Sequence, residues 1–177
     1  MDEKETVRLI QKYRHDLMNR LQIVSGYLSM EKTDKAKRNL DDVLRYYEEE
    51  RNLMRLNADS FMIWMLQFQD AYPSFALTYR VELLESVEKS IDEQELLITC
   101  KKLLAVLSEA AEELHVYDLF LHIQEKETHW IIRMNIKDVT LENMNVKHIE
   151  KQHGISVIQE KEQTSFEWNI AKVERGD

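Results

Sequence analysis

Residues 5–30 of this chain read ETVRLIQKYRHDLMNRLQIVSGYLSM, a stretch without proline. Its apolar residues recur mostly at three- and four-residue steps, which is the spacing of one face of an α-helix. They are Ile10, Leu17, Leu21, Val24 and Leu28. The stretch therefore predicts an amphipathic helix of about seven turns.

A second helix is predicted after the polar residues 31–34, where Thr33 or Asp34 is placed to cap it. Its apolar positions include Ala36, Leu40, Val43, Leu44, Tyr47 and Met54. The short connection predicts that the two helices are antiparallel neighbours. Each helix of such a hairpin has one apolar stripe, and burying both stripes well needs another pair of helices. We therefore expect a homodimer that forms a four-helix bundle.

The sequence pattern changes after residue 58, and we place a domain boundary there, between a hairpin of residues 1–58 and a second domain of residues 59–177. Helical spacing in the second domain alternates with short β-branched and aromatic segments that are typical of strands. The predicted helices cover 61–69, 93–114 (capped by Ser90 or Asp92) and 141–153, and the predicted strands cover 75–84, 119–125, 130–136, 155–159 and 165–170. This pattern predicts a small α/β sandwich, and with the hairpin an α+β chain.

The composition excludes several classes of protein. Hydrophobic residues make up 44% and charged residues 32% of the chain, and its longest uncharged apolar stretch, residues 61–69, is too short to span a membrane. The net charge of -9 argues against broad nucleic-acid binding. Residues 1–5 are polar and acidic, unlike a secretory leader. We expect a cytoplasmic protein that binds neither membranes nor nucleic acids.

The chain is also poor in glycine. Only Gly26, Gly154 and Gly176 occur, so the sequence contains no glycine-rich loop that could hold phosphates through bare backbone N–H groups. Direct use of ATP or of a dinucleotide is therefore not expected.

The chemistry of this chain is predicted to centre on His15. Helical spacing places His15, Asn19, Gln22 and Gly26 along one polar stripe of the first helix, away from the face of Leu17. His15 should therefore point outward, where a visiting protein can reach it. A neutral imidazole is a competent nucleophile near neutral pH, and it can accept a phosphoryl group without a catalytic triad.

The surroundings of His15 also suit phosphoryl transfer, which depends mainly on in-line placement and on neutralising the charge of the transferring oxygens. Arg14 and Arg20 are close enough in sequence to add positive charge. Asp16 is adjacent to His15, but neighbouring helical residues diverge by about 100°, which leaves their contact open. Gly26 has no side chain, so a partner's backbone could approach the helix closely there.

The stretch Arg14–Leu28 resembles the phosphoacceptor helix of a subgroup of sensor histidine kinases and, more closely, that of the sporulation initiation phosphotransferase B family. The resemblance is strong over residues 13–30 and extends to the pattern and length of the rest. It implies a dimeric four-helix bundle that bears the active histidine, followed by an α/β domain that resembles a kinase ATPase domain but does not bind ATP.

This resemblance implies a role for each residue of the motif. His15 is then the phosphorylated residue, supported by Arg14, Asp16 and Asn19, while Gln22 and Gly26 contact partner proteins. The implied reaction is a relay: His15 accepts a phosphoryl group from an aspartyl phosphate on a single-domain response regulator. It then passes the group to the receiver domain of a DNA-binding response regulator that controls entry into sporulation. Because receiver domains bring the Mg²⁺ ion, no tightly bound cofactor or metal is expected here.

The second domain offers an independent test of this resemblance. Residues 103–113 resemble the N-box of a kinase in outline, but Glu109-Ala110 stands where a kinase has Asn-Ala to help hold magnesium. A carboxylate at this position would oppose the phosphates of a nucleotide. Together with the missing glycine-rich boxes, this departure predicts that the domain has no kinase activity.

Other residues receive simpler interpretations. His115, His122, His129, His148 and His153 lack metal-ligand spacing and are interpreted as scattered surface histidines. The cluster of Met62, Trp64, Met65 and Phe68 is interpreted as core packing between the bundle and the α/β domain. Cys100 is interpreted as a small buried residue, and the glutamates of 48–50 and 109–113 as solvated helix faces.

Two other functions remain open at this stage. One is a dimeric module that binds response regulators without being phosphorylated, and the other is a fragment of an ATP-dependent histidine kinase.

Overall fold

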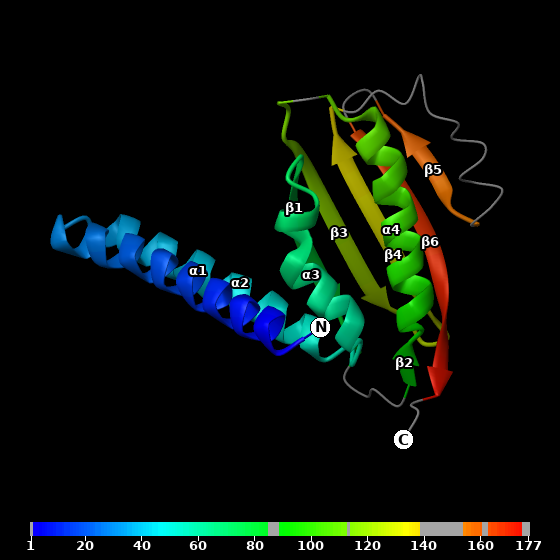
Figure 1. The fold of residues 1–177 in the computed structure, drawn as a ribbon, viewed down its shortest axis with the longest axis horizontal. Helices are drawn as coiled ribbons and strands as arrows, with labels where there is room; N and C mark the ends of the chain where they lie inside the picture. Colours follow the sequence, from blue (N-terminus) through cyan, green and yellow to red (C-terminus); the bar gives the residue numbers. More distant parts are fainter. Residues whose placement is uncertain (1, 85–88, 113, 139–153, 161–162, 175–177) are drawn as a thin grey trace. The chain divides into compact units, whose positions relative to one another are not determined.

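The computed structural model describes residues 2–84, 89–112, 114–138, 154–160 and 163–174 (Figure 1). The chain divides into two compact units, Met1–Arg51 and Asn52–Asp177. Our predicted boundary after residue 58 is further along the chain than this division. We call the first the helical unit and the second the sheet unit.

The helical unit is a hairpin of α1 (Glu3–Ser29) and α2 (Thr33–Met54), whose last residues extend into the sheet unit. Helix α1 begins with a capping box, in which the Asp2 carboxylate accepts the Glu5 N–H at 2.8 Å and the Glu5 carboxylate accepts the Asp2 N–H at 2.8 Å. It ends at a turn where Glu31 has a left-handed φ of 58°. Thr33 is already helical, so the predicted caps Thr33 and Asp34 are in the first turn of α2.

The apolar stripes of the hairpin are only partly buried in the single chain. Val24, Ala36 and Val43 are buried, because they lie where the two helices meet. Many other large apolar side chains of the hairpin are exposed, including five that were predicted to lie on its apolar stripes. The exposed set is Val7, Ile10, Met18, Leu21, Ile23, Leu28, Met30, Leu40 and Leu44. The contact between the two helices therefore buries only a few residues of each apolar stripe.

The described residues of the sheet unit form two further helices and six strands. They are α3 (Asp59–Ala71), β1 (Phe75–Glu82), β2 (Lys89–Ile91), α4 (Glu93–Ala110), β3 (Tyr117–Glu125), β4 (His129–Lys137), β5 (Ser156–Gln159) and β6 (Gln163–Glu174). The strand order is β1-β3-β4-β6-β2, with β5 also paired to β6. Strands β1 and β3 are parallel, and the other pairs are antiparallel.

The core of the sheet unit lies between one face of the sheet and helices α3 and α4, which cover that face in Figure 1. Alternation along the strands creates this face: Leu119, Leu121 and Ile123 of β3 are buried, while the residues between them are half-buried. Helix α4 contributes a buried stripe that includes Cys100. Its N-cap is Asp92, whose side chain accepts the Glu95 N–H at 2.9 Å.

The fold class predicted from the sequence is confirmed: a helical N-terminal region is followed by a mixed α/β sheet in two layers. The predicted final hairpin is the antiparallel pair β5–β6. Strand β2 was not predicted, and β6 is longer at both ends than the predicted residues 165–170. The predicted helix over 141–153 lies outside the described residues.

Candidate functional site

His15 is on the exposed side of α1, as the helical spacing predicts. Its side chain is 71% exposed in the single chain. The rest of its predicted stripe is also accessible, since Asn19 and Gln22 are exposed and Gly26 is half-buried. A Cβ atom added to Gly26 would meet no atom within 4 Å, so the surface there is open.

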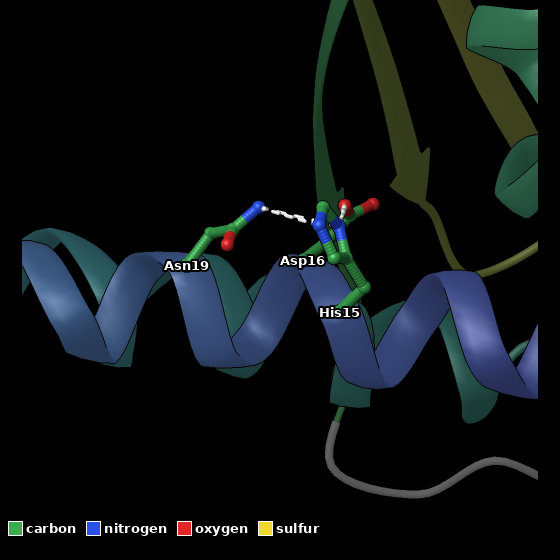
Figure 2. A network of polar contacts seen from close by, with 3 residues as sticks. All are labelled: His15, Asp16 and Asn19. Carbon is green, nitrogen blue, oxygen red and sulfur yellow. Dashed lines mark hydrogen bonds and ion pairs between the residues drawn. The ribbon is translucent and has the colours of Figure 1, made fainter.

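Two side chains of the same helix contact the imidazole of His15 (Figure 2). Asp16 Oδ1 is 3.2 Å from Nδ1, so the contact that the sequence left open is formed. One turn later, the Asn19 side-chain amide nitrogen is 3.2 Å from Nδ1 and 3.4 Å from Nε2. When Nδ1 donates its proton to Asp16, Nε2 carries the free lone pair. The motif therefore orients the imidazole with Nδ1 toward Asp16, which leaves Nε2 as the nitrogen for nucleophilic attack.

The arginines near His15 differ in what they contact. Arg14 is exposed. Arg20 is half-buried, and its guanidinium carbon lies 4.0 Å from the centre of the Tyr46 ring on α2. Arg20 is therefore part of the contact between the helices, and of the two arginines Arg14 is the one free to approach a phosphoryl group.

A polar cluster between the helices was not recognised in the sequence. Glu50 is only 2% exposed, so its assignment to a solvated helix face is wrong. It is three residues after Tyr47 and seven after the buried Val43, which is the helical spacing that carries it onto the packed stripe. That spacing was the available signal, and the run of three glutamates concealed it.

The electrostatics of this cluster follow from its burial. Burial raises the pKa of the Glu50 carboxyl above its ordinary value, while the hydrogen bond from Tyr13 and the charge of Arg20 act in the opposite direction. Burial also raises the pKa of the Tyr13 phenol, and the hydrogen bond to Glu50 adds to this shift. Burial therefore shifts the pKa of both groups in the direction that favours the neutral form.

The other described histidines each contact a different residue. His115 is exposed beside the Tyr117 ring, His122 Nε2 is 3.3 Å from Glu82 Oε1, and His129 Nδ1 is 3.0 Å from Thr128 Oγ1. His122 is largely buried in this contact, with 16% of its side chain exposed, so it is not the surface histidine that we expected. His148 and His153 are outside the described residues. Within the described part of the chain, no group of three or more His, Cys, Asp or Glu side chains could hold a metal ion.

Other predictions about the sheet unit can be compared with its structure. Trp64, Met65 and Phe68 are buried in the core of the sheet unit itself, and Met62 is half-buried. Glu109 is exposed near the end of α4. None of the described helices is both long and apolar enough to cross a bilayer.

Some known protein structures are similar to this chain. No curated protein sequence matches the chain. Similar solved structures include the nucleotide-free catalytic domain of the histidine kinase ThkA, with 11% identity, a TM-score of 0.44, and coverage of 68% of this chain and 92% of that one. The histidine kinase AdeS of Acinetobacter baumannii has 12% identity and a TM-score of 0.43, over 89% of this chain and 97% of that one.

A third structure, of ThkA in complex with the response regulator protein TrrA, has 12% identity and a TM-score of 0.40, over 97% of this chain and 62% of that one. The match to a family is confined to the helical part of the chain. The model of the family described as "Sensor_kinase_SpoOB-type, alpha-helical domain" matches residues 1–56. The hairpin that bears His15 therefore belongs to the SpoOB-type family of sensor kinase alpha-helical domains.

Proposed function

We propose that this chain is a phosphotransferase of a two-component phosphorelay that controls the initiation of sporulation. His15 accepts a phosphoryl group from the aspartyl phosphate of one response regulator and transfers it to the aspartate of a second one. The observation that carries the proposal is an exposed imidazole, contacted by Asp16 and Asn19, on a hairpin of the SpoOB-type family.

The reaction needs a nucleophile that gains and releases the phosphoryl group easily. The lone pair of His15 Nε2 forms the N–P bond while the P–O bond to the donor aspartate breaks, and that electron pair returns to the donor carboxylate. The ring then carries one positive charge, which Asp16 beside Nδ1 offsets. In the second transfer, the carboxylate of the acceptor attacks phosphorus, and the N–P electron pair returns to Nε2.

The partner proteins supply the remainder of the site. Receiver domains bring the Mg²⁺ ion, which neutralises charge on the transferring oxygens. On this chain, the Asn19 amide nitrogen is 3.4 Å from Nε2 and the exposed Arg14 is the residue before His15, and we expect both to contact those oxygens. Gln22 and Gly26 continue the same stripe and form part of the surface on which the receiver docks.

A homodimer is part of this proposal. The exposed apolar side chains of the hairpin are numerous for a surface that meets only water, and a second hairpin would cover them in a four-helix bundle. Such a bundle leaves His15 on its outside, because His15 is not on the apolar stripes. A rigid bundle also holds the imidazole in place for in-line attack.

In this proposal the sheet unit is a degenerate relative of a kinase ATPase domain. The scarcity of glycine and the exposed Glu109 where a kinase has asparagine both support a domain that does not use ATP. The phosphoryl group then comes from a response regulator.

The decisive experiment is phosphoryl transfer from a receiver domain labelled with ³²P. We expect the label to appear on the chain in an acid-labile, base-stable form and to be lost in His15→Ala. The matched control is His115→Ala, which removes an exposed histidine of the sheet unit and should leave labelling unchanged.

The same experiment separates the alternatives. A module that only binds regulators would remain unlabelled while still forming a complex with the receiver domain. A kinase fragment would label itself from ATP in the absence of any receiver. Either result would refute the proposal.

A further inference from the structure

The buried Glu50 joins the two helices of the hairpin near His15. Its Oε2 atom accepts a hydrogen bond of 2.9 Å from the hydroxyl of Tyr13 on α1. Its Oε1 atom is buried and has no hydrogen-bond partner among the described residues. A buried carboxyl oxygen without a hydrogen-bond partner is costly, since it gives up its hydrogen bonds to water and gains none in the protein. Glu50 therefore contributes little to stability, and its contact with α1 favours a role in the geometry of the hairpin.

A second contact between the helices lies on the other side of His15 in sequence. The Arg20 guanidinium is stacked on the Tyr46 ring, and the Tyr47 ring is 5.3 Å from that of Tyr46 and 6.1 Å from that of Tyr13. The aromatic rings therefore connect the Arg20 contact to the Tyr13–Glu50 hydrogen bond. Together the two contacts bracket His15, two residues before it and five after it.

Helix geometry gives these two anchors a common direction. At about 100° per residue, Tyr13 is about 160° and Arg20 about 140° around the axis of α1 from His15. Both anchors are thus on one line of α1 that faces α2, with His15 on the opposite side. Apolar contacts tolerate small rotations of a helix, whereas a hydrogen bond and a stacked guanidinium have preferred directions.

We propose that Tyr13 and Glu50, together with the Arg20–Tyr46 contact, are positioning residues that fix the rotation of α1 against α2 and so hold His15 in its outward orientation. The inference rests on the proposed function, because it assigns these residues to the phosphoryl transfer at His15. Rotation matters for this reaction because the imidazole nitrogen must approach phosphorus in line, and a displacement of about 1 Å can reduce a rate 100-fold.

The test combines three variants with one control. Tyr13→Phe removes the donor, Glu50→Leu removes the acceptor while filling the same space, and Glu50→Gln keeps an accepting oxygen. We expect a kcat for transfer from the labelled receiver that is about tenfold lower in Tyr13→Phe and Glu50→Leu, with KM within twofold of wild type. Glu50→Gln should retain the wild-type kcat. Tyr27→Phe is the matched control, since Tyr27 is on the same helix near its other end, where it contacts Lys35.

If Glu50 only stabilised the hairpin, a folded Glu50→Leu variant would keep the wild-type kcat. Glu50→Leu removes the unsatisfied oxygen and should be as stable as wild type in thermal unfolding, so a loss of kcat in this variant cannot come from unfolding. Wild-type kcat in a folded Glu50→Leu variant would overturn the inference.

A second readout needs no phosphoryl donor. Diethyl pyrocarbonate modifies accessible imidazoles, and mass spectrometry measures its rate at His15. We expect Tyr13→Phe and Glu50→Leu to lower this rate at least twofold, because His15 then spends part of its time turned toward the hairpin. If wild type is not phosphorylated but this rate falls, the proposed function fails and the positioning role stands. If wild type is phosphorylated and neither kcat nor the rate changes, the positioning role fails alone.

Discussion

Replacing Lys172 with methionine should destabilise the sheet unit strongly. Lys172 Nζ is 2.7 Å from Glu125 Oε1, and the two side chains are 8% and 0% exposed. The other oxygen of Glu125 accepts the backbone N–H of Leu84 at 2.8 Å. Lys172→Met keeps the length of the side chain but leaves a buried carboxylate with a single neutral hydrogen bond.

The magnitude follows from the burial of this pair. Removing one partner of a buried ion pair costs about 3–5 kcal/mol, because the remaining charge is uncompensated. A domain of this size is typically stable by about 5–15 kcal/mol. The variant should therefore lose at least about a fifth of the free energy of unfolding, and the double variant Glu125→Gln/Lys172→Met should recover much of it, since the neutral amide still accepts the Leu84 N–H.

Urea unfolding followed by tryptophan fluorescence measures this effect selectively. All three tryptophans, Trp64, Trp130 and Trp168, are in the sheet unit, so their emission reports on that unit alone. The matched control is Lys101→Met, an exposed lysine of α4, which should change the free energy of unfolding by less than about 0.5 kcal/mol. A cost below about 1 kcal/mol for Lys172→Met, or a double variant no more stable than the single one, would refute the reasoning.

Four further predictions concern the helical unit. Burial raises the pKa of Glu50 above its ordinary 4.5, so the stability that its protonation contributes is complete below pH 4.5 and is lost as pH rises through the raised pKa. The free energy of unfolding should fall by up to about 1.4 kcal/mol per pH unit in this range. Urea unfolding monitored by circular dichroism should show this slope in wild type and its loss in Glu50→Gln. Light scattering should show that the chain is the proposed dimer and that Leu44→Glu converts it to a monomer, whereas Leu114→Glu, at an exposed leucine of the sheet unit, should leave it unchanged. Asp16→Asn should slow the labelling of the chain by the phosphorylated receiver at least tenfold, and an unchanged rate would remove Asp16 from the mechanism. Asp2→Ala should cost about 1 kcal/mol of unfolding free energy, because the α1 capping box is lost.

Much of the fold was predictable from periodicity alone. Helix α1 and strands β3 and β4 have long runs of consistent spacing, and each was predicted to within three residues at both ends. Strand β2 has three residues, too few for an alternating pattern to stand out from its surroundings. Its pairing with the end of β6 depends on residues far apart in the sequence, which local patterns do not encode.

The candidate site was predictable only in part. The stripe from His15 to Gly26 follows from spacing along one helix, so its outward direction could be predicted without any knowledge of α2. The Tyr13–Glu50 hydrogen bond joins residues that are 37 positions apart, and it depends on the register between two helices. The run of glutamates 48–50 favoured a solvated helix face, because such runs are usually solvated. Consecutive helical residues point in different directions, however, and Glu50 points into the packed side of α2 while Glu48 is exposed.

The long strand β6 makes the folding of the sheet unit depend on residues synthesised late. Strands β4, β5 and β2 all pair with β6, which is the last described strand in chain order. While a ribosome is still translating the preceding residues, β4 has one open edge and β2 has no neighbour in the sheet. The contacts of the α1–α2 hairpin join residues between Glu3 and Met54, so the hairpin can form long before that point. We therefore expect ribosome-bound chains that stop before Gln163 to carry a formed hairpin attached to an unfinished sheet unit that chaperones recognise.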